Sequence, residues 1–180
     1  SYIDNATGDF YIRQLADDKD IIFQSDDSSG GVETYFFLDG SKSTGYPYTI
    51  FPDNAFLGIG SSGDLTLQHD GTDSTISNAT GDFIIKTGAD DKDIIFKCDD
   101  GSGSTETYFY IDGSLADGTW TYTTWVDGGV INLGDSRDLQ LYHDGTNSYI
   151  TNQTGDLYIT NQLDDKDIIL RSDDGSGGVE

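Results

Sequence analysis

Hydrophobic and polar residues alternate in short runs along this chain. In its middle part such runs cover residues 64–70, 74–77, 82–86, 92–98 and 106–112. Between them lie segments rich in Gly, Asp and Asn, the residues that favour tight turns. Alternation with a period of two over four to eight residues is typical of half-buried β-strands, so the pattern predicts many short strands joined by turns.

The alternation also predicts two faces for these strands, because successive side chains of a strand point to opposite sides. One face is apolar and is the expected core; in the middle part it carries Leu65, Leu67, His69, Phe83, Ile85, Ile94, Phe96, Cys98, Phe109 and Ile111. The other face mixes polar and aromatic side chains, among them Gln68, Lys97, Tyr108 and Tyr110.

The chain is also an internal repeat, which decides how it is organised. Residues 1–40 and 74–113 are identical at about two positions in three, and a third copy of the same pattern opens at Ser148. Residues 63–73 recur at 137–147 as well. We therefore divide the chain into repeat units 1–73 and 74–147 and a partial unit 148–180, and we expect it to be a slice of a longer array.

The repeat predicts an elongated all-β protein. Each run supplies only two or three core side chains. Burying one large apolar side chain stabilises a protein by roughly 1.5–3 kcal/mol. One unit is therefore expected to need stacking on neighbouring units, or pairing with other chains, to be stable. Segments 42–58 and 115–132 lack the regular alternation, and they are expected to be variable loops or irregular strands.

Composition and charge exclude two classes of partner, nucleic acids and membranes. The chain has 180 residues, with 33 Asp plus Glu against 9 Lys plus Arg, and a formal net charge of −24. Only three of the acids are Glu, whereas Asp recurs at the turns of every unit. No basic stripe for nucleic acid can be built, an anionic membrane surface would repel the chain, and no run approaches a membrane span. We expect neither nucleic-acid nor membrane partners, and no secretory signal segment opens the sequence.

Clustered carboxylates and two histidines are the candidate metal ligands. Ca²⁺ prefers six to eight oxygen ligands, which paired turn carboxylates could supply. The spacing matches neither the EF-hand loop nor the GGxGxD nonapeptide of Ca²⁺-binding β-rolls, so a solvated, locally capped turn is the favoured alternative. His69 and His143 share one phase of the repeat and could meet around a trimer axis to bind a metal; a packed histidine at a strand end is the favoured alternative. The candidate metal-ligating residues are Asp26, Asp27, Asp99, Asp100, Asp173, Asp174, His69 and His143. No other cofactor is indicated.

Other motifs carry little chemistry. Cys98 is replaced by Ser25 and Ser172 in the sister units, so a special role for the thiol is not expected. Asn5, Asn78 and Asn152 each open an Asn-x-Thr glycosylation pattern, and a strand-connecting turn explains them at least as well. No carboxylate pair, Ser-His-Asp set or phosphate loop stands out, so we expect no enzyme activity.

Exposed aromatic residues are the candidate binding surface, since aromatic faces suit sugar rings and exposed apolar patches mark interfaces. The strand residues Tyr35, Phe37, Tyr108 and Tyr110 are expected to pack against other subunits or coils. The candidate saccharide- or receptor-binding residues lie in or beside the variable segments: Tyr46, Tyr48, Trp120, Tyr122 and Trp125.

The repeated pattern GDLxLxHDGTxSxI…TGDFxI…DDKDIIFxxDDGSGxxETYFxxDGS resembles the repetitive shafts of tail fibres and tail-fibre-like proteins of bacteriophages, many of them marine. It covers residues 59–113 and 133–180, with 1–40 as a partial copy. The resemblance implies an intertwined fibrous homotrimer with a β-helical or β-prism shaft, located in the virion outside the host cell. It also implies a receptor-binding tip carried by the shaft, but it does not indicate which receptor is bound. A host-surface polysaccharide is a candidate partner because aromatic faces suit sugar rings. No tip, virion-attachment domain or self-cleaving chaperone is recognisable.

Two other functions stay open from the residues alone. One is a secreted bacterial adhesin or surface-filament repeat, in which tandem units stack within one chain. The other is an endoglycosidase tailspike, which needs a carboxylate pair in a groove.

Overall fold

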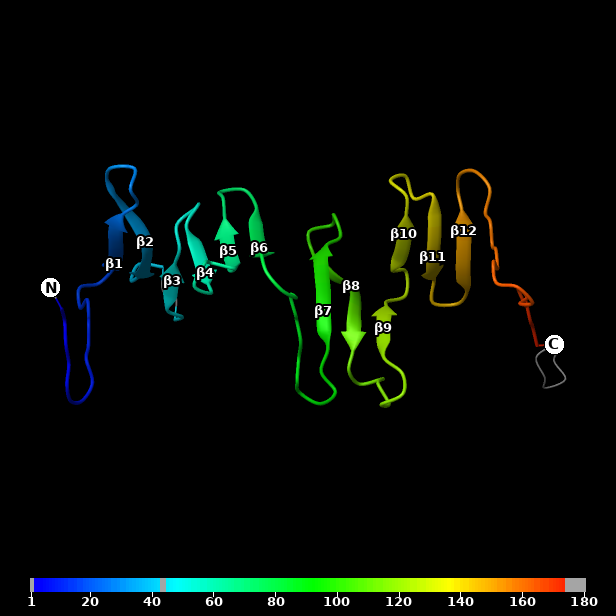
Figure 1. Ribbon diagram of the computed structural model, residues 1–180, viewed down its shortest axis with the longest axis horizontal. Helices are drawn as coiled ribbons and strands as arrows, with labels where there is room; N and C mark the ends of the chain where they lie inside the picture. Colours follow the sequence, from blue (N-terminus) through cyan, green and yellow to red (C-terminus); the bar gives the residue numbers. More distant parts are fainter. Residues whose placement is uncertain (1, 43–44, 174–180) are drawn as a thin grey trace. The chain divides into compact units, whose positions relative to one another are not determined.

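The protein folds into β-strands connected by turns, as shown in a computed structural model that describes residues 2–42 and 45–173 (Figure 1). The strands of this part are β1 (Ile21–Asp26), β2 (Val32–Asp39), β3 (Tyr48–Ile50), β4 (Phe56–Ile59), β5 (Leu65–His69), β6 (Ser74–Asn78), β7 (Ile94–Asp99), β8 (Thr105–Asp112), β9 (Tyr122–Trp125), β10 (Val130–Leu133), β11 (Leu139–His143) and β12 (Ser148–Asn152). The all-β prediction is confirmed. Within the described ranges there is no helix that could cross a membrane.

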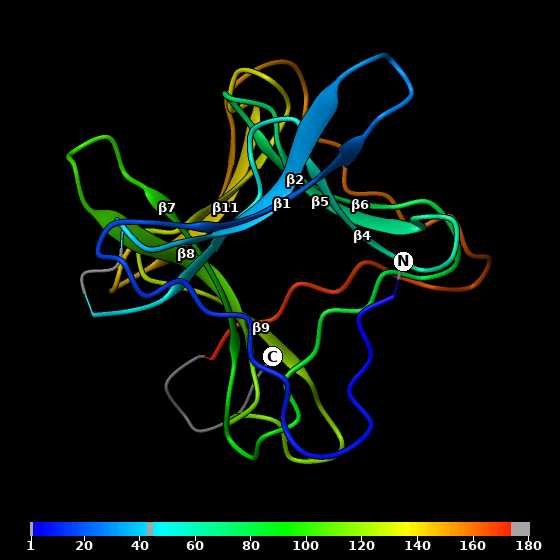
Figure 2. The same cartoon turned by 90° about the vertical axis from the view of Figure 1, so that its left-hand side faces the viewer.

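The strands form four three-stranded antiparallel sheets in tandem. The first unit, Ser1–Ile84, holds the sheets β1-β2-β3 and β4-β5-β6, and the second, Ile85–Glu180, holds β7-β8-β9 and β10-β11-β12. In every sheet the spatial order of the strands follows their order in the chain (Figure 1). The pairs β1–β2 and β7–β8 also lie side by side in Figure 2. Each sheet is therefore a local meander that needs only short connections.

The sheets reproduce the sequence repeat. β1 begins at Ile21 and β7 at Ile94, which is the same phase of the repeat, and β5 and β11 correspond in the same way at Leu65 and Leu139. One repeat unit thus consists of one sheet of the β1–β3 kind followed by one of the β4–β6 kind. The tandem-repeat prediction is confirmed at this level.

Asp side chains shape the turns, as the Asp-rich composition predicts. In the turn between β5 and β6, the Asp70 carboxylate accepts hydrogen bonds from the backbone N–H groups of Thr72 (2.9 Å) and Asp73 (2.8 Å). These bonds, that from Asp73 first, hold the pKa of Asp70 below its ordinary value. Gly71 has φ of 97°, which only glycine adopts readily. The same arrangement recurs at Asp144 with Thr146 and Asn147.

The expected core is not buried. Among the described residues no hydrophobic side chain is buried, and the only buried residue is Asp112. Among the described residues the extensive contacts between strands all lie within one sheet, so within each unit no second sheet packs on the apolar faces described here. The predicted apolar face exists, since Phe96 and Phe109 pair across β7 and β8, but a single chain leaves it exposed.

One set of predicted strands is wrong. Residues 82–86 belong to no strand, and the same holds for 9–13 and 156–160 in the sister units. Alternation favours an extended backbone, but a strand also needs a hydrogen-bonded neighbour, and none lies beside these segments in the described part of the chain. Residues 168–170 also belong to no strand within the described residues, and a strand there stays a prediction.

The irregular segments do contain strands. Segment 42–58 provides β3 and part of β4, and segment 115–132 provides β9 and most of β10. Of the two alternatives left by the sequence, irregular strands are therefore correct. These strands have only three or four residues, which explains why alternation does not reveal them.

Candidate functional site

A stack of three aromatic rings crosses the β7–β9 sheet. Phe96 of β7 lies 4.5 Å from Phe109 of β8, measured between ring centroids, and Phe109 lies 4.7 Å from Trp125 of β9. The register of the sheet causes this, because Phe109 is opposite both Phe96 and Trp125. Cross-strand aromatic pairs are worth roughly 0.5–1.5 kcal/mol beyond the area that they bury.

The β1–β3 sheet carries the corresponding stack. Phe23 lies 4.5 Å from Phe36, and Phe36 lies 5.8 Å from Phe51. We call the two sets, Phe23–Phe36–Phe51 and Phe96–Phe109–Trp125, the aromatic ladders. Their outer rings keep 37% to 39% of their surface exposed, so each ladder offers an apolar surface that the chain itself does not cover.

The ladder includes one of the residues expected to bind a saccharide or receptor. Trp125 stacks on Phe109, as described above, so its ring is part of the sheet surface. Tyr48 and Tyr122 occupy the first positions of β3 and β9, opposite Asp39 and Asp112. The Lys42 ammonium lies 5.8 Å from the centroid of the Tyr48 ring, within the range of a cation–π contact.

The other two aromatic candidates lie outside the strands. Tyr46 and Trp120 precede β3 and β9 and are 75% and 65% exposed. The Trp120 backbone N–H donates to the Asp117 carboxylate at 2.8 Å, which fixes the turn but leaves the indole free of any ring contact in the described part of the chain. The five candidates therefore do not form one platform: one is stacked in a ladder, two begin strands and two are exposed in turns.

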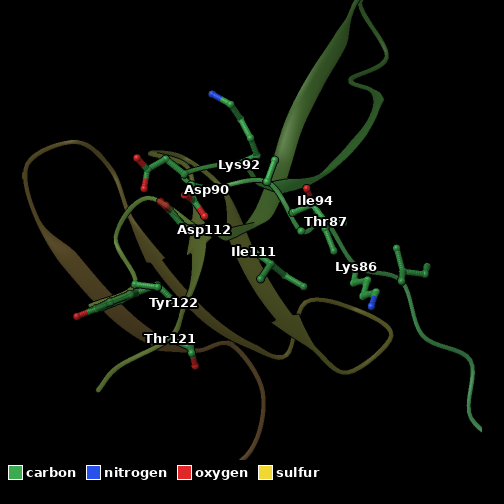
Figure 3. A pocket seen from close by; sticks show the side chains of 15 residues that line it. Lys86, Thr87, Asp90, Lys92, Ile94, Ile111, Asp112, Thr121 and Tyr122 are labelled. Atoms are coloured by element: carbon green, nitrogen blue, oxygen red, sulfur yellow. The ribbon is translucent and has the colours of Figure 1, made fainter. Parts of the chain in front are cut away.

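A groove of about 590 Å³ lies beside the β7–β9 sheet. Figure 3 shows Tyr122 and Lys86 on opposite sides of it, with Ile111 between them. Asp90, Lys92 and Asp112 also contribute to its wall. The groove combines an apolar floor with a few charged groups, and sequence patterns did not indicate it because its walls come from segments that are distant in the chain.

Asp112 is the buried carboxylate at this groove, and its role is structural. One oxygen, Oδ1, accepts from the Ser114 hydroxyl (2.8 Å) and from the backbone N–H groups of Ser114 (2.9 Å) and Leu115 (3.0 Å). The other, Oδ2, lies 3.5 Å from the Thr124 hydroxyl. These bonds, led by those from the Ser114 hydroxyl and the Leu115 N–H, hold the pKa of Asp112 below its ordinary value. A carboxylate stabilised in this way is ionised near neutral pH and is poorly suited to donate a proton.

A second carboxylate fastens the same strand end. The Asp93 side chain accepts a hydrogen bond of 3.0 Å from the Gly113 N–H, and Asp20 does the same for Gly40 in the first unit. Alternation and turn motifs did not indicate this link. The signal for it was the constant separation of the Lys-Asp and Asp-Gly-Ser motifs in both units, which fixes the Asp before β7 against the Gly after β8.

The candidate calcium ligands lie in the turns between β1 and β2 and between β7 and β8. Asp27 accepts from the Ser29 N–H (2.9 Å) and hydroxyl (2.6 Å), and Asp100 bonds Ser102 in the same way. The Ser hydroxyl is the largest cause of the lowered pKa of Asp27 and of Asp100.

Their neighbours are engaged similarly. Asp26 accepts from the Ser28 N–H at 2.9 Å and Asp99 from the Gly101 N–H at 3.1 Å. Asp173 is the last residue described, and Asp174 lies outside the described residues. Within the described residues no three His, Cys, Asp or Glu side chains lie close enough together to hold a metal ion. The geometry favours capped turns, and Ca²⁺ binding stays a prediction.

The two histidines are at equivalent strand ends. His69 Nδ1 lies 3.1 Å from the Ser74 hydroxyl, and His143 Nδ1 lies 3.1 Å from the Ser148 hydroxyl. In each case the serine is the residue directly opposite on the next strand. This is the arrangement expected of a histidine that closes a hairpin; the second nitrogen of each ring makes no hydrogen bond in the part of the chain that is described.

The Asn-x-Thr motifs are turns. The Asn78 side-chain amide donates to the carbonyls of Thr80 and Gly81, both at 2.9 Å, and Asn152 donates to Thr154 (3.0 Å) and Gly155 (2.8 Å). The amide nitrogen that would carry a glycan is thus bonded to the backbone in both. This supports the turn interpretation.

Comparison with known proteins provides no further guide to the site. No protein-family model, curated protein or solved structure matches the chain.

Proposed function

We propose that this chain is a structural repeat segment of a bacteriophage tail-fibre shaft, without catalytic activity, that holds and presents a receptor-binding tip. Three chains assemble in parallel into an intertwined β-helical or β-prism shaft, in the virion and outside the host cell. The observation that carries the proposal is a repeated sheet architecture with no buried hydrophobic side chain among the described residues. Such sheets need partners to cover their apolar faces.

The aromatic ladders and the sequence resemblance support the same conclusion. The ladders recur once per repeat unit, as expected of a surface used at regular intervals along a fibre. A host-surface polysaccharide remains a proposed partner of this chain, and its candidate contacts remain Tyr46, Tyr48, Trp120, Tyr122 and Trp125.

The test is the mass of the chain in solution. Sedimentation equilibrium over a range of protein concentrations should give a species three times the 19.5 kDa of one chain. Elongated particles should appear in electron micrographs, and antibodies against the chain should label fibres of the source virion. A monomer at every concentration would rule out the trimeric shaft.

One observation favours a second candidate, a repeat module of a secreted bacterial adhesin or surface filament. Every sheet is a local meander of consecutive strands, so tandem units could stack within one chain without exchanging strands. This alternative predicts a stable monomer whose thermal midpoint does not depend on protein concentration, whereas the midpoint of an obligate trimer rises with concentration.

A further inference from the structure

Three segments of the chain have the sequence of strands but no strand partner. We call them the GDFxI segments: residues 8–12, 81–85 and 155–159, which read GDFYI, GDFII and GDLYI. Their aromatic and β-branched residues favour strands, yet the segments belong to no helix or strand, and the glycine that opens each one has φ between 65° and 77°. Each segment has three apolar side chains, and all nine are 46% to 80% exposed.

Their backbone is almost unused within the chain. In the described residues the only hydrogen bonds to backbone groups of these segments are made by the preceding Asn side chains, which bind the carbonyls of Gly8, Gly81 and Gly155. A short turn separates residue 85 from β7, yet no backbone hydrogen bond joins the two. An apolar segment with free backbone N–H and C=O groups can pair with the edge of a sheet.

We propose that the GDFxI segments add as strands to open sheet edges in a second copy of this chain. The proposal rests on the proposed function, since it requires assembly. The repeat identifies the occupant: the segments return at the same phase in all three units, so a partner that pairs with all of them must offer acceptor edges with the same period. This chain offers such edges, because within its described part both outer strands of each sheet are unpaired on one side.

Local charge permits this pairing in a very acidic chain. Asp9 is followed by Arg13, and Asp82 by Lys86, so two of the segments and their flanking residues are balanced although the whole chain carries −24. Strand addition there avoids placing like charges opposite one another, which destabilises cross-strand pairs.

The first experiment measures amide hydrogen exchange of the full chain by mass spectrometry, in the assembled state and after dilution to monomer. Peptides covering the GDFxI segments should exchange about a hundredfold more slowly when assembled, because their N–H groups become hydrogen-bonded. In the monomer they should exchange as an unprotected chain does. Protection that is already present in the monomer would place the partner within the same chain and overturn the proposal.

The second experiment uses matched triple variants at the central position of each segment. Tyr11→Pro/Ile84→Pro/Tyr158→Pro removes one N–H per segment and should weaken assembly roughly tenfold or more, because proline cannot donate to a ladder. Tyr11→Val/Ile84→Val/Tyr158→Val removes the same side chains but keeps the N–H and should assemble within about twofold of the wild type. Within the described residues both variants lose the same two side-chain hydrogen bonds, from the Tyr11 hydroxyl to Asp9 (3.1 Å) and from the Tyr158 hydroxyl to Asp156 (3.2 Å), so the pair differs in the backbone N–H groups.

The outcomes separate this proposal from the proposed function. If the wild type sediments as an oligomer while the segments stay unprotected and the proline variant assembles normally, strand addition is wrong and the trimeric shaft stands. If the wild type is a monomer at every protein and salt concentration, both are wrong.

Discussion

At the scale of the residue, equivalent turn positions in the repeat units share the same backbone conformation. Three pairs of equivalent positions show this: Gly63 and Arg137, Gly101 and Ser28, and Gly128 and Asn54 all have positive φ, although only one member of each pair is glycine. Such a conformation costs an L-residue roughly 1–2 kcal/mol. The fold thus imposes the same backbone on both units even where the sequence has diverged.

Replacing Arg137 by glycine tests this constraint. Arg137 has φ of 63° and makes no hydrogen bond in the described part of the chain, whereas Gly63 has φ of 66°. We expect Arg137→Gly to raise the free energy of unfolding by about 0.5–1 kcal/mol, since the relieved strain exceeds the entropy that glycine gains when unfolded. The reverse change at the matched position, Gly63→Arg, should lower it. Urea denaturation measures both, and shifts in the same direction would contradict the explanation.

The Asp112 carboxylate should make stability depend on pH in acid. Its pKa is below the ordinary 3.8, so its hydrogen bonds contribute fully above that value and are lost as pH falls through the folded-state pKa. Asp112→Asn should therefore be less stable than the wild type near neutral pH, with the difference shrinking below about pH 4.

The matched control is Asp135→Asn, which removes one negative charge but no hydrogen bond in the described residues. It separates the loss of the Asp112 bonds from the general relief of charge repulsion. Thermal denaturation from pH 2 to 7 is the measurement, and a constant gap between wild type and Asp112→Asn would argue against the assigned role.

At the scale of the element, the β1–β3 and β7–β9 sheets are each fastened at one end by carboxylates and braced across one face by aromatic rings. In the β7–β9 sheet these are the Asp93–Gly113 bond and the Phe96–Phe109–Trp125 ladder. The register of β7 and β8 also shifts by one residue between Phe96 and Lys97, so Tyr108 of β8 has no opposite residue on β7. The same shift follows Phe23 in β1, so this β-bulge is a regular feature of the repeat.

Gly113 should be essential for the fastened end of β8. A Cβ atom at this position would lie 2.5 Å from the Lys92 carbonyl oxygen, so the backbone must move and the bond from Gly113 N–H to Asp93 lengthens. We expect Gly113→Ala to lower the free energy of unfolding by about 1–3 kcal/mol. Gly88→Ala, where a Cβ meets nothing within 4 Å, is the control and should have little effect. Equal effects of the two changes would show that the close approach does not matter.

At the scale of the whole molecule, the apolar surfaces favour assembly and the charge opposes it. Each chain carries a formal charge of −24, and any oligomer multiplies that charge. Most of the acids are exposed, so their repulsion is screened by salt: the Debye length falls from about 10 Å at 0.1 M to about 3 Å at 1 M.

Assembly should therefore strengthen with salt. We expect the protein concentration at half-assembly to fall at least about tenfold between 0.05 and 1 M NaCl, as screening reduces the repulsion. Sedimentation velocity across this range is the measurement. Sucrose at matched viscosity is the control, and assembly that weakens with salt would show that ion pairs hold the chains together.

The sequence by itself determined the local structure of this protein. Alternation predicted most strands, Asp and Gly predicted the turns, and the repeat predicted that the sheets recur, because each depends on residues close together in the chain. Only the tertiary structure decided which alternating runs pair. It left the GDFxI segments unpaired, brought Phe51 and Trp125 into the ladders, and joined Asp93 to Gly113. Hydrogen-bond partners and stacked rings come from neighbouring strands, and alternation within one run carries no information about its neighbour.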